Sequence, residues 1–387
     1  MKRSFTKEYS FIQFVFALVG SSILGFSTVY LLKNGFNTNQ IGIFISTANI
    51  SVVIFQVILT RYNKDGTKNS IKIANIMILL SIISLLILLF QRTKFIILIL
   101  FFLPYLISIA LQANINIITG IIKLMEMEIN IGISRIFAAV AFSLNTYFLS
   151  ILIKKTDVNT MIYFSALFYL ILFFSLKLVP KNIESNDDIE LLEIKETSYT
   201  INRKTYITFI CFCFGYACFC AFHYMKTTFL INIIENVNAN IDDLGKALSI
   251  ASLSEIPILL VYKPLKEKIG TKKILSISSK VFLLQGIILF FSRTILGVYI
   301  FSIIQGGAFG LMIPSSIEYI NEEYNADLLY KFQSYLISAT SLGVLSGTLL
   351  GGYTLDKLTY FTFKIFALIF VFIGSVAYII SFNREKI

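Results

Sequence analysis

Long apolar runs separated by short polar segments dominate the chain. Each run has about 20 residues or more, which is enough for a helix to cross a hydrocarbon core of roughly 30 Å. A helix satisfies its own backbone hydrogen bonds in lipid, whereas a β-barrel would show short alternating segments. The pattern predicts an all-α membrane protein with twelve transmembrane helices. They are expected over residues 9–32, 39–60, 71–90, 95–122, 131–153, 159–179, 205–234, 241–262, 274–292, 294–320, 330–355 and 360–381.

One longer polar stretch, residues 180–204, interrupts this pattern near the middle of the chain. It carries a run of acidic residues and Pro180, a composition typical of a solvated linker. We therefore predict an N-terminal six-helix bundle over 1–179, a cytoplasmic acidic linker over 180–204 and a C-terminal six-helix bundle over 205–387.

The two predicted bundles carry related loops about 204 residues apart. Segments 63–69 and 267–273 agree at four positions, which are Lys64 with Lys268, Gly66 with Gly270, Thr67 with Thr271 and Lys68 with Lys272. A repeat of this length made of membrane spans indicates a transporter built from two pseudo-symmetric halves around a central cavity.

Composition and charge agree with a membrane protein. Hydrophobic residues make up 56% of the 387 residues and charged residues 14%, with a mean hydropathy of +0.79, whereas soluble domains have about 25% charged residues. If both termini are cytoplasmic, nineteen Lys and Arg residues of the loops lie inside and seven outside, which satisfies the positive-inside rule. Topology and anionic lipid therefore explain the net charge of +11, and we expect no nucleic-acid partner.

The loops resemble the signature of the major facilitator superfamily, roughly Asp-(Arg/Lys)-x-Gly-(Arg/Lys)-(Arg/Lys) between helices 2 and 3. The second copy keeps an acid at Glu267, whereas the first copy has Asn63 there. Ser254-Glu255-Ile256-Pro257 and Gly132-Ile133-Ser134-Arg135 are similar to motifs of the subgroup with lactose permease, nucleoside–proton symporters and phenylpropionate permease. The resemblance implies the major facilitator fold and a multi-pass protein of the plasma or inner membrane. It also implies a gating role for the loop residues Asn63, Lys64, Gly66, Lys68, Glu267, Lys268, Gly270 and Lys272.

Two ionisable side chains within predicted helices are candidates for proton coupling. Glu255 is about 14 residues, or roughly 21 Å, from the outer end of its helix, so it lies near the middle of the membrane, where a carboxylate is expensive and usually functional. His223 is the single histidine of the chain and lies at a similar depth, where it can relay a proton. The alternative for each is a structural hydrogen bond between helices.

Polar side chains of other predicted helices are candidates for binding the solute. They are Gln13, Gln112, Asn116, Arg135, Lys226 and Tyr216. The amides could instead join helices, Lys226 could extend to the outer surface, and Arg135 could be an interfacial anchor. Glu318 is a candidate intracellular gate, with a simple interface residue as the alternative.

The sequence contains no pattern that indicates an enzyme or an ATP-driven pump. It lacks a Walker motif, and the one histidine has no partners for a Ser–His–Asp site. The four cysteines lie at spacings that cannot chelate a metal, so we expect no metal or cofactor and only the proton as coupling ion. We predict a monomeric symporter for a small solute such as a sugar, nucleoside or organic or aromatic acid. A proton antiporter exporting drugs or metabolites is the alternative, although residues 9–32 lack the acid that exporters often have; a transport-inactive sensor is less expected.

Overall fold

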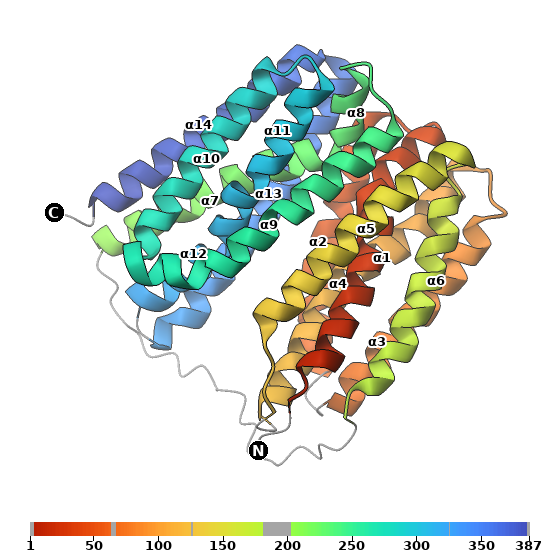
Figure 1. Cartoon of the computed structure of the whole chain (residues 1–387), viewed down its shortest axis with the longest axis horizontal. Helices are drawn as coiled ribbons and strands as arrows, with labels where there is room; N and C mark the ends of the chain where they lie inside the picture. Colours follow the sequence, from red (N-terminus) through yellow and green to blue (C-terminus); the bar gives the residue numbers. More distant parts are fainter. Residues whose placement is uncertain (1–3, 63–66, 125–126, 181–202, 325, 385–387) are drawn as a thin grey trace. The chain divides into compact units, whose positions relative to one another are not determined.

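The computed structural model describes residues 4–62, 67–124, 127–180, 203–324 and 326–384. These residues are almost entirely helical (Figure 1). They include twelve helical segments that are long and apolar enough to cross a membrane. The prediction of an all-α protein with twelve transmembrane helices is therefore confirmed.

The helices of the first half follow the predicted runs closely. They are α1 (Thr6–Lys33), α2 (Thr38–Tyr62), α3 (Thr67–Leu88), α4 (Lys94–Leu124), α5 (Ile131–Lys155) and α6 (Thr160–Ser175), which ends in a 3₁₀ turn over Leu176–Leu178. Those of the second half are α7 (Arg203–Thr228), α8 (Leu230–Glu235), α9 (Ile241–Ile269), α10 (Thr271–Phe291), α11 (Ile295–Gln305), η3 (Gly306–Gly310), α12 (Leu311–Glu323), α13 (Ala326–Lys357) and α14 (Tyr360–Arg384).

The prediction of a single helix over 205–234 is wrong at its C-terminal end, because the helix is interrupted at Phe229. This residue leaves the helical conformation (φ −103°, ψ 25°), and the short α8 follows. The Phe229 ring is fully buried, and a Cβ on Gly351 of α13 would lie 2.8 Å from it. The Thr228 carbonyl accepts a hydrogen bond from the Thr28 hydroxyl (2.6 Å), so a polar group at the break has a partner outside its own helix.

The helix predicted over 294–320 contains an irregular turn that the apolar pattern does not reveal. Between α11 and α12, residues Gly306–Gly310 form one π-helical turn, η3. Such turns insert an extra residue into an α-helix and occur frequently at functional sites. The sequence of this turn, Gly-Gly-Ala-Phe-Gly, allows other helices to approach it closely.

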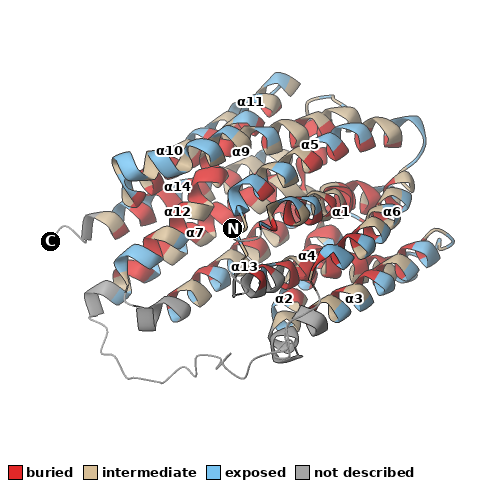
Figure 2. Cartoon of the chain, turned by 60° about the horizontal axis from the view of Figure 1, so that its bottom comes forward, coloured by how far each residue is buried: buried red, intermediate tan, exposed pale blue. Residues whose placement is uncertain are grey.

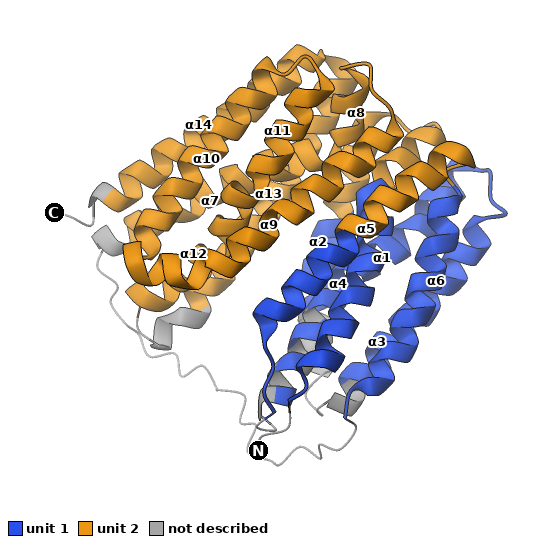
Figure 3. Ribbon diagram, in the orientation of Figure 1, with its two compact units in different colours: residues 1–26, 48–142, 159–201 blue, residues 27–47, 143–158, 202–387 orange. Residues whose placement is uncertain are grey.

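The structure divides into two compact units, which are coloured in Figure 3. Unit 1 is formed within residues 1–26, 48–142 and 159–201, and unit 2 within 27–47, 143–158 and 202–387. Unit 2 therefore includes the end of α1, the start of α2 and the end of α5 together with the second half of the chain. The predicted boundaries 1–179, 180–204 and 205–387 remain a prediction.

In unit 1, α3 packs against α4 and α6. Hydroxyl groups tie these helices together, because Ser84 donates to the Leu100 carbonyl (2.6 Å) and Tyr169 donates to the Pro104 carbonyl (2.9 Å). In unit 2, α7 packs along α13 and α14, and α9 packs along α11 and η3. Burial follows this packing, with buried residues on the faces where helices meet and exposed residues on the other faces (Figure 2). Many exposed residues are large and apolar, such as Phe90 (83%) and Phe291 (72%), as expected of surfaces in contact with lipid.

Candidate functional site

Glu255 lies in the middle of α9 and faces protein. Its side chain is half-buried, and its Oε1 accepts a hydrogen bond from Gln305 Nε2 at the end of α11 (3.4 Å). A Cβ on Gly310 would lie 3.6 Å from the Glu255 Cγ, so η3 packs against the same side chain. The carboxyl group therefore belongs to a contact between α9 and the π turn.

The residue before Glu255 fixes the start of this turn. The Gly306 N–H donates to Ser254 Oγ (3.0 Å), and Ser254 Oγ lies 2.7 Å from the Ala251 carbonyl, to which it donates. A side chain at position 306 would overlap the backbone carbonyl of Ser254. Glycine is thus required at Gly306, because only its bare backbone can approach α9 so closely.

Lys226 joins Glu255 through a third residue. Its ammonium donates to Gln305 Oε1 (2.6 Å), and the amide group of the same glutamine donates to Glu255. Lys226 is buried, with 2% of its surface exposed, so it does not extend to an outer surface. Side chains of α7, α11 and α9 therefore form one polar chain within unit 2, running Lys226–Gln305–Glu255.

His223 lies three residues before Lys226, on the same face of α7. Its ring stacks on Phe309 of η3 with 3.8 Å between the ring centroids and 7° between their planes. His223 is buried, and its Nδ1 has no hydrogen-bond partner among the described residues. His223 and Glu255, the two candidates for proton coupling, both contact the π turn.

The second loop copy forms a charged cluster where α9, α10 and α12 meet. Lys266 pairs with Glu318 (2.5 Å) and Glu322 (3.1 Å), and Lys272 pairs with Glu323 (2.8 Å). Glu318, a candidate gate, is thus bound to a lysine of a neighbouring helix. Of the other predicted loop residues in this copy, Glu267 and Lys268 are exposed, and Gly270 joins the two helices with a φ of 79°, which favours glycine.

The first loop copy, residues 63–69, lies mostly outside the described residues. Asn63, Lys64 and Gly66 lie outside the described residues, and Lys68 lies in the first turn of α3 with its side chain outside the description.

The remaining binding candidates are not members of this polar chain. In unit 1, Gln13 donates to the Tyr9 hydroxyl (2.7 Å). Gln112 donates to Asn116 (3.1 Å), as expected of amides four residues apart on α4, and Arg135 is exposed in the first turns of α5. Tyr216 is buried in the aromatic core of unit 2, 6.5 Å from the Phe212 ring centroid.

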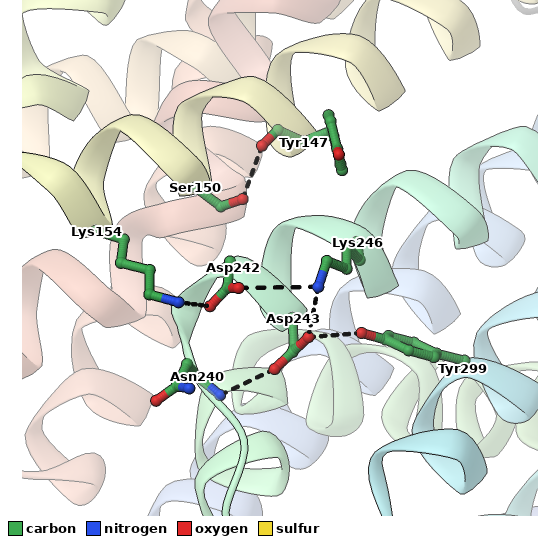
Figure 4. Close-up of polar contacts among 8 residues, drawn as sticks. All are labelled: Tyr147, Ser150, Lys154, Asn240, Asp242, Asp243, Lys246 and Tyr299. Atoms are coloured by element: carbon green, nitrogen blue, oxygen red, sulfur yellow. Dashed lines mark hydrogen bonds and ion pairs between the residues drawn. The ribbon is translucent and has the colours of Figure 1, made fainter.

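A second polar cluster, at the start of α9, was not predicted. Figure 4 shows Lys154 of α5 bound to Asp242 (3.0 Å) and Lys246 bound to Asp243 (3.0 Å). Tyr299 donates to Asp243 as well (2.7 Å). Acids four and three residues before a lysine are a visible signal for part of this cluster, but the partner on α5 is 88 residues away.

Small residues bring helices from the two halves of the chain together inside unit 2. A Cβ on Gly245 of α9 would overlap Ser150 and the Thr146 carbonyl of α5. A Cβ on Gly42 of α2 would overlap the Thr348 carbonyl of α13. Hydroxyl pairs accompany both contacts, Ser143 with Ser249 (2.5 Å) and Ser46 with Thr348 (2.6 Å).

Comparison with known proteins gives one family and several solved structures. The model of the MFS_1 like family matches residues 7–365. The nucleoside transporter NupG has a similar structure, with a TM-score of 0.77 at 15% identity, over 98% of this chain and 99% of that chain. A mutant of the peptide transporter POT gives a TM-score of 0.72 at 12% identity, over 98% and 94% of the two chains.

A bacterial homolog of the human lysosomal transporter Spinster, solved inward-facing and unoccupied, gives a TM-score of 0.66 at 11% identity, over 98% and 96%. No curated protein matches the sequence. At these identities the likeness to solved structures establishes the fold, and the family match establishes the kind of protein.

Proposed function

Because the chain belongs to the MFS_1 like family, and is thus a membrane transporter of the major facilitator type rather than an enzyme, we propose that it imports a small polar solute by proton symport. The solute is of the sugar, nucleoside or organic-acid type. Transport occurs across the plasma membrane by alternating access, with both termini cytoplasmic and the protein acting as a monomer. Glu255 is the coupling carboxyl.

The observation that carries this proposal is the environment of Glu255. The carboxyl group lies at the middle of a membrane-spanning helix, faces protein rather than lipid, and bonds to an amide that also binds a buried lysine. Ionisable groups in such positions are costly and mark ion or substrate pathways. A carboxyl group that water reaches from each side in turn can take up a proton on one side and release it on the other.

The structures of similar transporters support the solute class. They include structures titled as a nucleoside transporter and as a peptide transporter, and nucleosides and peptides are small polar molecules. Charged and amide side chains at the centre of unit 2 suit a hydrogen-bonding solute better than an apolar one.

The test begins with purified protein and a thermal-shift screen of sugars, nucleosides and organic acids. Solutes that stabilise the protein are then assayed in proteoliposomes for exchange and for uphill uptake driven by a proton gradient. Solute uptake that makes the outside medium more alkaline supports symport. Drug export driven by inward proton flow supports the antiport alternative.

The decisive variant is Glu255→Gln. We expect it to retain solute exchange and to lose accumulation driven by the gradient, because the amide cannot carry the proton. Glu128→Gln, which changes an exposed acid outside the helices, is the matched control and should behave as the wild type. Unchanged pH dependence and unchanged accumulation in Glu255→Gln would refute the coupling role.

A further inference from the structure

Lys226 is a buried lysine whose described hydrogen bond goes to a neutral group. Its one described hydrogen bond goes to the Gln305 carbonyl (2.6 Å), and the acid that interacts with it electrostatically, Glu255, lies on the other side of that glutamine. An ammonium group has three donors, and burying it without a counter-charge is expensive. When Lys226 is protonated, its ammonium group therefore has donors beyond the one that Gln305 accepts.

Gln305 lies between this cation and the nearest acid. Its carbonyl faces Lys226 and its amino group faces Glu255. Gln305 and Glu255 are half-exposed, whereas Lys226 and His223 are buried. The glutamine and the acid are therefore more accessible than the lysine and the histidine.

The same face of α7 carries a second unsatisfied group. His223 is 7% exposed, and its Nδ1 lacks a partner among the described residues, although its ring is held flat against Phe309. Buried polar atoms normally have partners, so an orphan atom calls for an explanation. Lys226 and His223 together offer hydrogen-bonding capacity that this part of the protein does not use.

We propose that the solute carries a carboxylate beside a hydroxyl group, and that it takes the place of the Gln305 amide. The carboxylate binds Lys226, and the neighbouring donor binds Glu255. This inference rests on the transport function proposed above and names its substrate class. It makes Lys226 and Gln305 the residues that determine specificity.

Charge and geometry both favour this class. Replacing a neutral acceptor by an anion puts a negative charge in direct contact with the Lys226 ammonium, and hydrogen bonds between charged groups are stronger than neutral ones. One lysine matches a single negative charge, so a carboxylate fits better than a doubly charged phosphate. The solute must also donate to Glu255, because it displaces the amino group that does so now.

The experiment compares three 2-hydroxy acids with two sets of analogues. Lactate, mandelate and gluconate are each measured beside the carboxamide, which removes the charge, and beside the deoxy acid, which removes the donor. Thermal shift of the purified full chain measures binding, and exchange in proteoliposomes measures transport. We expect at least one hydroxy acid to bind about 10-fold or more tightly than its carboxamide and its deoxy analogue.

Variants then assign the preference to Lys226. Lys226→Gln should weaken binding of the acid by about 10- to 100-fold and leave binding of the carboxamide nearly unchanged. Lys226→Arg should keep the preference for the acid. Lys280→Gln, which removes an exposed lysine of α10, is the control and should match the wild type.

Three results would overturn the inference. They are equal binding of acid and carboxamide by the wild type, an unchanged preference for the acid in Lys226→Gln, and no response to any compound of the set. The retained binding of the carboxamide in Lys226→Gln separates a loss of specificity from a loss of folding. Gradient-driven uptake of a different solute would contradict this substrate class while leaving the role of Glu255 intact, so the two proposals fail separately.

Discussion

Replacing Gly245 by alanine should loosen the contact between α5 and α9. These helices come from different halves of the chain and meet inside unit 2. The added Cβ would overlap the Ser150 side chain and the backbone carbonyl of Thr146. The Ser150 hydroxyl can rotate away, but the carbonyl belongs to the helix and cannot, so α5 and α9 must move apart.

The size of the effect follows from this overlap. Forcing an extra methyl group into a well-packed contact costs about 1–3 kcal/mol. This free-energy cost applies only to conformations in which α5 and α9 touch. It therefore lowers their population by about 5- to 150-fold relative to conformations in which the two helices are apart. The neighbouring hydrogen bond between Ser143 and Ser249 (2.5 Å) and the ion pair between Lys154 and Asp242 (3.0 Å) should weaken with it.

Hydrogen–deuterium exchange measured by mass spectrometry can detect the change. Peptides covering residues 143–158 and 241–250 should exchange faster in Gly245→Ala than in the wild type. Gly20→Ala is the matched control, because a Cβ on Gly20 meets nothing within 4 Å, and alanine favours a helix over glycine by up to about 1 kcal/mol. Wild-type exchange in both segments of Gly245→Ala, or stabilisation like that of the control, would refute the reasoning.

Two further predictions concern charged groups of unit 2. Lys266→Met should lower the free energy of unfolding by about 1 kcal/mol, since it breaks part-exposed ion pairs with α12. The difference from wild type in thermal unfolding should shrink in high salt. Lys268→Met, which changes an exposed lysine, should have little effect, and an equal loss of stability in both variants would contradict the prediction. Burial raises the pKa of Glu235, with Lys33 opposing the shift. The folded protein therefore binds a proton at Glu235 more readily than the unfolded chain does. Stability should rise as pH falls from the raised pKa towards the ordinary value near 4.5. Glu235→Gln should reduce this pH dependence in thermal melts across the same range.

The sequence was sufficient for the parts of the fold that depend on local pattern. Apolar runs predict the twelve spans because a membrane imposes one length on each helix. The position of Glu255 along its predicted helix also indicates an acid near the middle of a membrane span. The break at Phe229 has no signal in the apolar pattern, and the Phe229 ring packs near Gly351, which lies 122 residues further along the chain.

The key residue of the site was missed for a similar reason. Gln305 is one polar residue within the apolar run predicted over 294–320, and nothing next to it in sequence suggests a function. Its importance comes from Lys226 and Glu255, which are 79 and 50 residues away. Conversely, the chemistry of Tyr216 suits a binding site, but the structure places it in an aromatic core. Residue type identifies candidates, whereas only packing identifies which candidates meet.

The π turn explains why these distant residues meet at one place. Gln305 directly precedes η3 and reaches Lys226 and Glu255, while Phe309 within η3 holds the ring of His223. In a continuous α-helix, side chains four residues apart lie on the same face, and the extra residue of the π turn changes that alignment. Gly306 then lets the turn contact Ser254, next to Glu255. Acid, lysine and histidine are therefore connected through a single irregular turn, and a shift of that turn would alter all three of their contacts together.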